Sequence, residues 1–251
     1  MNNKVVIGLP AYNEGLVLPQ LLRSFEPLKE SLGSGFEVLV INDGSTDNTE
    51  ETLQEYARSC SYLRYISHPK NQGLGMAIKT LFSNVIDTYN DEDVLITLDA
   101  DNTHCPELIP RLLDKLEQEH LDLVIASRFT PGGKEIGLAL HRKICSRGAG
   151  LLLKTFFPID NVRDYSCGYR AYKLGYLKRA MELYDGEIIT SNGFECMAEI
   201  LARFSKIGVQ VGEYPLELHY ELKKGRSKMN LTRTIMGYLR LLKVVKKPLL
   251  H

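Results

Sequence analysis

Short apolar runs and longer amphipathic stretches alternate along the first half of the chain. The short runs predict strands at residues 5–9, 37–41, 63–66, 94–98 and 121–126. The longer stretches repeat their apolar positions at helical spacing and predict helices at about residues 14–29, from 47 onward, at 74–89 and at 106–119. Strands that alternate with helices of this length form mostly parallel sheets covered on both faces. We therefore expect an α/β fold.

The alternation is looser beyond residue 126. The Gly/Pro-rich stretch "RFTPGGKEIG" predicts a mobile loop. Further elements are expected as a helix at 140–154, a strand at 169–172, a helix at 193–204, an extended region at 209–220 and a last helix at 231–247. Since the chain has no linker-like segment and no internal repeat, we expect a single domain over residues 1–222. Residues 223–251 are then an extension made of a basic flexible loop and an amphipathic helix.

Polar turns follow three of the predicted strands. They read "PAYNEG" after residues 5–9, "NDGSTD" after residues 37–41 and "DADNTH" after residues 94–98. Ligands of such sheets bind beyond the carboxyl ends of the strands, where these turns would meet. Asx-rich turns are also good helix caps, and capping alone explains the presence of Asp47, since Glu50 three residues later completes a capping box. For Asn42 the turn-forming and ligand-binding roles both stay open.

Asp99 and Asp101 stand on either side of an alanine at the last of these turns. A helix cap needs one carboxylate, so the second one calls for another explanation. Two close anionic oxygens suit a divalent cation that also takes phosphate oxygens as ligands. We therefore expect Mg²⁺ or Mn²⁺ holding a diphosphate, where the cation neutralises charge on the leaving group. His104 is expected to precede the next helix without binding the metal, and a ligand role for His104 or His219 stays open.

Charge and cysteine content narrow the function classes. The chain has 251 residues and a formal net charge of +0, which gives no support to nucleic-acid binding. Its five cysteines form no CxxC, which argues against a disulfide framework or a zinc site. No signal peptide stands at the N-terminus, and no apolar run approaches the roughly 18–20 residues of a membrane-spanning helix. We expect a reduced, cytoplasmic setting.

The basic charge gathers at the C-terminal end. Nine lysines and arginines and no acidic residue lie between Leu222 and His251. On a helical wheel one face of the last helix is apolar and the other is basic; the apolar face consists of Leu231, Ile235, Tyr238, Leu242 and Val245. Such a helix can lie on an anionic membrane surface. It can equally pack on the domain or on a partner subunit in a homodimer.

The motifs together carry a family resemblance. "GLPAYNEG", "VLVINDGSTDNT", "NQGLGMAIKT" and "LITLDADNTHCPE", in this order, resemble the family-2 inverting glycosyltransferases of the GT-A fold. "VIASRFTPGG", "HRKICSRGAGLLLK", "VRDYSCGYRAYK", "NGFECMAEIL" and "GRSKMN" are similar to the dolichyl-phosphate mannose synthase group of polyprenyl-phosphate glycosyltransferases. The resemblance covers roughly residues 4 to 230. It implies a Rossmann-like GT-A domain and transfer of a sugar from a nucleotide-diphosphate sugar, GDP-mannose or a UDP-sugar, to a polyprenyl phosphate.

The resemblance also implies a donor site. Positions that match the family's nucleotide pocket are Pro10, Tyr12, Glu14, Asp43, Asn71 and Gly73. Asp99 and Asp101 match the metal-binding DxD motif, with Asp101 as the direct ligand. Arg226 and Lys228 in "GRSK" would close over the diphosphate.

On the acceptor side the resemblance implies phosphate-binding arginines, because the planar guanidinium suits bidentate phosphate contacts. They are Arg128, Arg142 and Arg170. The loop at residues 131–133 would close over the site. Asp164 and Glu199 match catalytic positions, and Glu199 or its neighbour one turn earlier, Glu195, would meet sugar hydroxyls.

The acceptor decides the mechanism. A phosphate acceptor is already a nucleophile and needs no base, whereas a hydroxyl of a soluble acceptor needs one, with Asp164 or Glu199 as candidates. The chain lacks tryptophan and the arginine that many relatives carry before GxSK, which leaves the acceptor open. A nucleotide-sugar-binding protein without catalysis is a further alternative. The donor base and the sugar are not determined by the sequence.

Overall fold

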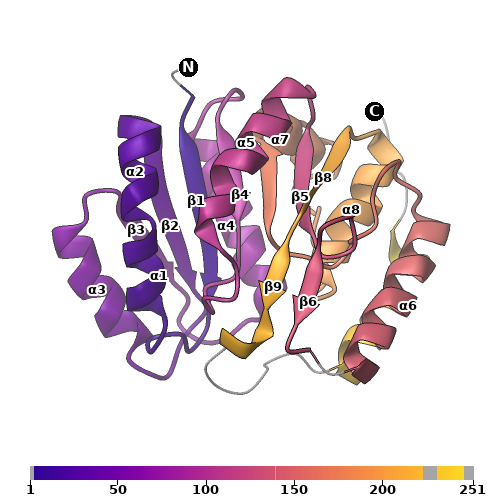
Figure 1. Cartoon of the computed structure of the whole chain (residues 1–251), viewed down its shortest axis with the longest axis horizontal. Coiled ribbons are helices and arrows are strands. Elements are labelled where there is room, and N and C mark those ends of the chain that lie inside the picture. The colour runs from indigo at the N-terminus through magenta and orange to yellow at the C-terminus, as the bar shows by residue number, and fades with distance from the viewer. Residues whose placement is uncertain (1–2, 139, 223–230, 246–251) are drawn as a thin grey trace.

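The computed structural model describes residues 3–138, 140–222 and 231–245, and its centre is a seven-stranded sheet (Figure 1). The strand order is β3-β2-β1-β4-β7-β5-β8. These strands are β1 (Val5–Ala11), β2 (Phe36–Asn42), β3 (Leu63–Ser67), β4 (Val94–Thr97), β5 (Leu123–Ser127), β7 (Arg170–Lys173) and β8 (Val211–Pro215). All neighbours pair in parallel except β7, which is antiparallel to β4 and β5. The expected mostly parallel α/β fold is confirmed.

Helices cover both faces of this sheet (Figure 1). They are α1 (Leu18–Ser24), α2 (Glu26–Leu32), α3 (Thr49–Ser59), α4 (Leu74–Thr88), α5 (Ile109–Gln118), α6 (Leu140–Phe156), α7 (Leu174–Leu183), α8 (Cys196–Ile207) and α9 (Leu231–Val244). Helix α4 contacts α7 and α8 behind the sheet, while α1, α2 and α5 lie in front of it in Figure 1. Short 3-10 turns at Gly33–Gly35, Pro106–Leu108 and Tyr220–Leu222 complete the set.

Some element boundaries differ from the sequence prediction. The single helix expected at residues 14–29 is two helices, α1 and α2, which join at Phe25. Pro27 explains the division, because it has no N–H to continue the first helix and suits the first turn of a new one. Helix α7 was not predicted. Within the expected mobile loop, β6 (Lys134–Ile136) pairs in parallel with β9 (Glu217–His219) as a small second sheet.

The start of α3 corrects the expected capping box. Its N-cap is Asn48, and the Glu50 carboxylate accepts hydrogen bonds from Asn42 Nδ2 at 2.6 Å and from the Ser67 hydroxyl. Asn42 is therefore a buried structural residue that joins the ends of β2 and β3 to α3. The amide also accepts from the Ser45 N–H at 3.1 Å, which fixes the turn after β2.

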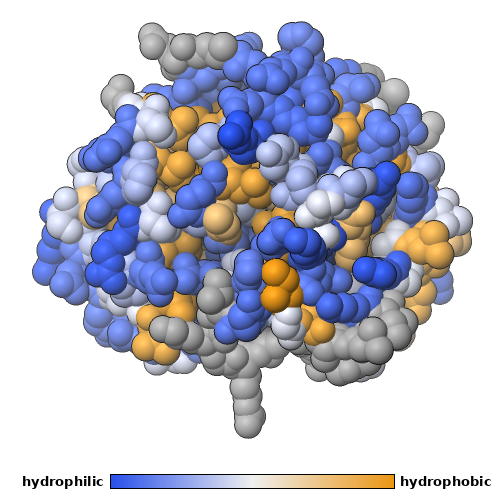
Figure 2. Space-filling view, viewed as in Figure 1, coloured by the Kyte–Doolittle hydropathy of each residue, from blue (hydrophilic) through white to orange (hydrophobic). Residues whose placement is uncertain are grey.

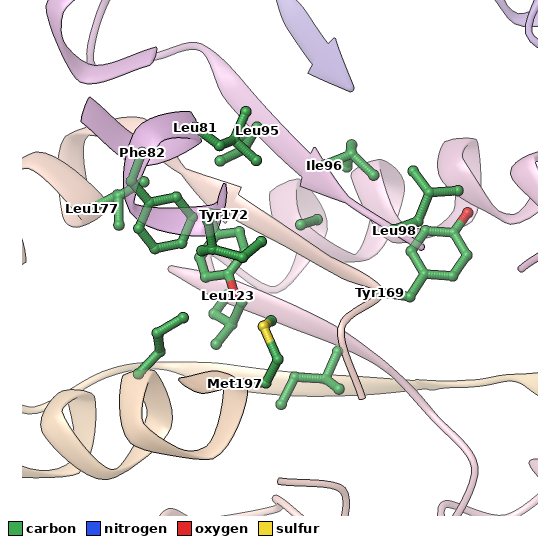
Figure 3. Close-up of a cluster of buried hydrophobic side chains, with 14 of the residues drawn as sticks. Leu81, Phe82, Leu95, Ile96, Leu98, Leu123, Tyr169, Tyr172, Leu177 and Met197 are labelled. Atoms are coloured by element: carbon green, nitrogen blue, oxygen red, sulfur yellow. The ribbon is translucent and has the colours of Figure 1, made fainter. Parts of the chain in front are cut away.

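The core lies on both faces of the sheet, under α4, α7 and α8 on one side and under α1, α2 and α5 on the other. Every residue of β4 is buried, as expected for a central strand covered on both faces. Figure 3 shows Phe82 of α4 and Tyr172 of β7 in this cluster, with ring centroids 5.5 Å apart in an edge-to-face arrangement. This packing fixes the end of β4 at which Asp99 and Asp101 emerge.

The last helix packs on the domain, against α6 and α8. Its buried side chains are Thr234, Tyr238, Leu241 and Val245. The expected apolar face is thus only partly right, since Ile235 points outward with 37% exposure. No helix in the described part of the chain is both long and apolar enough to cross a membrane. Residues 223–230, which contain the expected basic loop, lie outside the described residues.

Candidate active site

The turns after β1, β2 and β4 meet at one edge of the sheet, because these three strands are adjacent and parallel. They open into a cavity of about 460 Å³. Its wall contains every described residue expected to hold the donor or the metal: Pro10, Tyr12, Glu14, Asp43, Asn71, Gly73, Asp99 and Asp101. Residues up to 91 positions apart in the sequence are thereby brought into one site.

Asp43 organises the floor of the cavity. Its Oδ1 accepts from the Gln72 N–H at 2.9 Å, and its Oδ2 accepts from the Gly73 N–H at 2.8 Å. Its Oδ1 also lies 2.8 Å from Nδ1 of the buried His68, whose Nε2 hydrogen bonds to the Thr80 hydroxyl at 2.9 Å. Since a carboxylate only accepts, Nδ1 carries the proton in this pair. The sequence motifs gave no indication of His68.

The Asp99–Asp101 turn is mostly buried and held by hydrogen bonds. Asp101 Oδ1 accepts from the hydroxyl of Thr103 at 2.6 Å and from its N–H at 3.2 Å. The Asp99 N–H donates to Nδ1 of His104 at 3.0 Å, and the His104 ring lies 5.1 Å from that of Tyr169. Because Nδ1 accepts this bond, the imidazole proton is on Nε2. The His104 side chain therefore helps to hold the turn by accepting a hydrogen bond from the backbone N–H of Asp99.

The donor set at this turn fits a hard divalent cation. Within the described residues no cluster of three or more His, Cys, Asp or Glu side chains could hold a metal. Asp99 and Asp101 are thus two carboxylates that would share a cation with ligands from elsewhere. Mg²⁺ is commonly held in this way, by one or two carboxylates, substrate phosphates and water.

Arg128 and Asp164 form a buried ion pair outside the described cavity. Arg128 Nε and Nη2 donate to Asp164 Oδ2 and Oδ1, each at 2.7 Å, and Nη2 also donates to the Ser166 hydroxyl at 2.7 Å. Nη1 donates to the Tyr220 hydroxyl at 3.2 Å and lies 3.6 Å from Glu135 Oε1. The guanidinium expected to grip an acceptor phosphate is thus held in place by protein partners, and its role toward an acceptor stays a prediction.

Asp164 is poorly suited to the expected role of a base. It is fully buried and also accepts from the backbone N–H groups of Arg128, Ser166 and Cys167. Burial alone would raise the pKa of its carboxyl, but the Arg128 guanidinium and these donors outweigh burial and lower the pKa. Asp164 therefore stays ionised and structural.

Arg170, which was also expected at the acceptor site, lies among protein partners. Its side chain is fully buried, and its donors bind the carbonyls of Cys167 at 2.8 Å and Tyr165 at 3.0 Å and the Tyr172 hydroxyl at 3.4 Å. It thus braces the chain between Tyr165 and β7.

Glu199 is buried as well and is not in the cavity wall. Its carboxylate accepts from the N–H and hydroxyl groups of both Thr190 and Ser191 and from Arg203 Nη2 at 3.0 Å. Burial would raise its pKa, but the hydrogen bonds from Ser191 and Thr190 lower it on balance. The carboxylate expected to meet sugar hydroxyls meets the backbone of a loop.

Several cavity residues were not among the predicted site residues. One group is the segment Asn192, Gly193, Phe194 and Glu195 before α8, of which only Glu195 was considered. The other is Arg233 and Thr234, in the first turn of α9. Both groups reach the cavity only through the packing of α8 and α9.

Other expected site residues remain without a described position. Arg226 and Lys228 lie outside the described residues, and of Arg142 only the backbone in α6 is described. A second hollow of about 460 Å³ is lined by Arg128 together with the basic side chains of Arg147, Lys154 and Arg163.

Comparison with known proteins bears on this site. A family model described as "Glycosyl transferase family 2" matches residues 6–181, which include the turns after β1, β2 and β4. The chain belongs to glycosyl transferase family 2. This confirms the expected family and its glycosyltransferase chemistry.

Curated relatives are 30–32% identical to this chain over the aligned regions. An undecaprenyl-phosphate mannosyltransferase of Micrococcus luteus is 32% identical over 228 residues, 90% of this chain and 88% of that protein. A dolichol-phosphate mannosyltransferase of Pyrococcus furiosus is 30% identical over 240 residues, 94% of this chain but 62% of its own length. The chain also spans 64% of a Salmonella paratyphi B undecaprenyl-phosphate 4-deoxy-4-formamido-L-arabinose transferase, at 32% identity.

Solved structures support the GT-A fold of this family member. Glucosyl-3-phosphoglycerate synthase from Mycobacterium tuberculosis, in complex with Mn²⁺, UDP and phosphoglyceric acid, superposes with a TM-score of 0.68. The match covers 96% of this chain and 78% of that one at 19% sequence identity. At this identity the likeness concerns the fold.

Proposed function

We propose that this protein transfers a sugar from a nucleoside-diphosphate sugar to the phosphate of a polyprenyl phosphate. The observation that carries the proposal is the single cavity that joins the turns after β1, β2 and β4 with the Asp99–Asp101 pair. The curated relatives named above act on undecaprenyl or dolichol phosphates, as their names state. An acceptor phosphate oxygen would bond to the anomeric carbon as the diphosphate oxygen leaves, with inversion.

The buried carboxylates favour the phosphate acceptor over a hydroxyl acceptor. A hydroxyl nucleophile needs a base within hydrogen-bond reach. Asp164 and Glu199, the two candidates, are fully buried, fully hydrogen bonded and have lowered pKa values. A phosphate needs no proton removed. The protein then contributes by positioning two anionic reactants and by balancing their charge.

Asp99 and Asp101 are proposed to hold Mg²⁺ or Mn²⁺ together with the donor diphosphate. When bound, the cation would neutralise the charge that develops on the leaving diphosphate. Thr103 and His104 keep the two carboxylates in place through the hydrogen bonds of the turn. The structural neighbour from Mycobacterium tuberculosis was crystallised with Mn²⁺ and UDP, which supports a divalent metal in general.

A membrane contact through α6 and α9 is part of the proposal. Large apolar side chains are exposed on both helices, which contact each other; they are Leu151, Phe156, Ile235, Met236 and Leu239. Figure 2 shows hydrophobic residues at the edge of the molecule that α6 forms in Figure 1. Neither helix contains an acidic residue, and Arg147 and Lys154 line the hollow beside Leu151. An apolar face with basic neighbours suits an anionic bilayer, in which a polyprenyl phosphate resides.

The test is sugar transfer into vesicles that contain undecaprenyl phosphate. Labelled GDP-mannose and UDP-glucose are supplied with Mn²⁺, and the label that partitions into organic solvent is counted. Asp101→Asn should abolish the product, as should EDTA, whereas Asp87→Asn, an exposed aspartate on α4, should leave it unchanged. Label found only in a soluble saccharide would support the hydroxyl acceptor and overturn the proposal. Metal-dependent binding of donors without any turnover would support a binding protein.

A further inference from the structure

The segment Thr190–Glu195 lies between the cavity and the buried carboxylate of Glu199. On one side Asn192, Gly193, Phe194 and Glu195 line the cavity, next to the predicted nucleotide-binding residues. On the other side Thr190 and Ser191 are bound by Glu199, one turn into α8. The loop therefore presents four residues to the donor while its base is held from behind.

Glu199 holds this base with an unusually complete set of bonds. Both oxygens accept from the Thr190 N–H, at 3.1 and 3.0 Å, and Oε2 accepts from the Ser191 N–H at 2.9 Å. The hydroxyls of both residues and Arg203 complete the set. A fully buried carboxylate is tolerated only when its oxygens are paired in this way, so the loop and the charge stabilise each other.

The far side of the loop is seated on the start of α4. The Gly75 N–H donates to the Asn192 carbonyl at 3.1 Å. A Cβ at Gly73 would lie 2.2 Å from that carbonyl oxygen, and one at Gly75 would lie 1.7 Å from the Ser191 carbonyl oxygen. Only glycines allow this approach of two backbones. Because Asp43 binds the Gly73 N–H, a continuous chain of contacts runs from the nucleotide side to Glu199.

The chemistry of the exposed loop residues suits a sugar. A carboxylate at Glu195 and an amide at Asn192 are groups that pair with sugar hydroxyls. We propose that Glu199 is a positioning residue for donor-sugar selectivity: it fixes the Asn192–Glu195 segment so that these groups distinguish sugar epimers. The inference rests on the proposed nucleotide-sugar donor but not on the polyprenyl acceptor.

The test is binding of epimeric donors to the full chain, measured by calorimetry with Mn²⁺ and no acceptor. The pairs are GDP-mannose with GDP-glucose and UDP-glucose with UDP-galactose, and GDP and UDP alone report on the nucleotide side. Glu199→Gln keeps the shape but replaces one acceptor by a donor. It should lower the preference between epimers about tenfold, the effect of one or two lost hydrogen bonds, while the Kd of the free nucleoside diphosphate stays within about twofold.

Matched variants separate positioning from general damage. Glu182→Gln, on an exposed face of α7, should change neither quantity. Ser191→Ala removes a single hydroxyl donor to Glu199 and should reduce selectivity in the same direction by a smaller factor, even if Glu199→Gln folds poorly. Glu199→Asp, which keeps the carboxylate, should retain more of the preference between epimers than Glu199→Gln does. Unchanged selectivity in the Gln and Ala variants, or an equal loss of free-nucleotide binding, would overturn the inference. If the wild type transferred no sugar to polyprenyl phosphate but the variants still altered epimer selectivity, only the acceptor proposal would fail.

Discussion

The Asp164 carboxylate and the Arg128 guanidinium meet through two parallel hydrogen bonds of 2.7 Å, in a place where Asp164 is fully buried. The pair spans 36 residues and joins the end of β5 to the chain before β7. The bidentate geometry is the strongest form of this ion pair. The relationship predicts that both residues, which were expected at acceptor-binding and catalytic positions, stabilise the fold.

Asp164→Asn is expected to destabilise the fold. Removing one partner of a buried pair leaves the other charge uncompensated and costs about 3–5 kcal/mol. Urea unfolding at neutral pH measures the loss, and Asp160→Asn, at an exposed aspartate nearby in the chain, is the matched control.

Because the folded pKa of Asp164 is lowered, its stabilisation is present above the unfolded pKa and is lost as the pH falls through the folded pKa. The variant should therefore show a weaker acid dependence of stability than the wild type. A loss below about 1 kcal/mol, the range of exposed ion pairs, would contradict the structural role.

Glu135→Gln is expected to stabilise the protein at neutral pH. The carboxylate is buried on β6, and neither of its oxygens has a hydrogen-bond partner among the described residues. Burial raises its pKa, which the nearby Arg128 offsets only in part. A carboxyl with a raised folded pKa costs stability as the pH rises from its unfolded pKa through its folded one, so Gln should raise Tm at pH 7 and not at pH 4.

The control for this prediction lies on the adjacent strand. Glu217 is exposed and pairs with Lys134 at 2.7 Å, so Glu217→Gln should leave Tm almost unchanged. A lower Tm for Glu135→Gln at pH 7 would mean that its ionised form stabilises Arg128 by more than burial costs.

The donor side of the site could be predicted from the sequence because its residues are local to strand ends. Asp43, Asp99 and Asp101 follow buried strands directly, and the parallel sheet brings such turns together without any knowledge of side-chain packing. Where a clear apolar run predicted a strand, the polar residues that follow it do line one cavity.

The acceptor side could not be predicted in the same way. A motif states that a carboxylate or an arginine is present, but not whether it faces a cavity or a buried partner. Glu199 faces a loop eight and nine residues before it, and Arg170 faces carbonyls of its own segment. These outcomes depend on how α8 and β7 pack. The same holds for Arg233, whose helix was treated only as an amphipathic surface.

Gly75→Ala is expected to damage the donor site more than the fold. The new methyl group would meet the Ser191 carbonyl at 1.7 Å and push the 190–195 segment away from α4. Binding of any nucleotide sugar should weaken by about tenfold or more, since such displacements are costly at a binding site. In Gly148→Ala nothing lies within 4 Å of the new Cβ, and the replacement of a helical glycine should stabilise α6 by about 0.5–1 kcal/mol. Equal donor affinity in the Gly75→Ala protein would contradict the close seating of the loop on α4.

Met236→Asp and Leu239→Asp are expected to weaken membrane binding without affecting the donor site. Their side chains are 61% and 42% exposed on α9, so neither supports the core. Charged residues there would be repelled by an anionic bilayer and would remove apolar area from the contact. Flotation with vesicles containing phosphatidylglycerol should show a severalfold lower bound fraction, whereas GDP or UDP affinity stays constant. Leu16→Asp is the matched control, because Leu16 is 74% exposed but precedes α1, which lies at the opposite end of the molecule from α6 in Figure 1. If Leu16→Asp reduced flotation as much as the α9 variants do, the α6–α9 face would not be the contact surface.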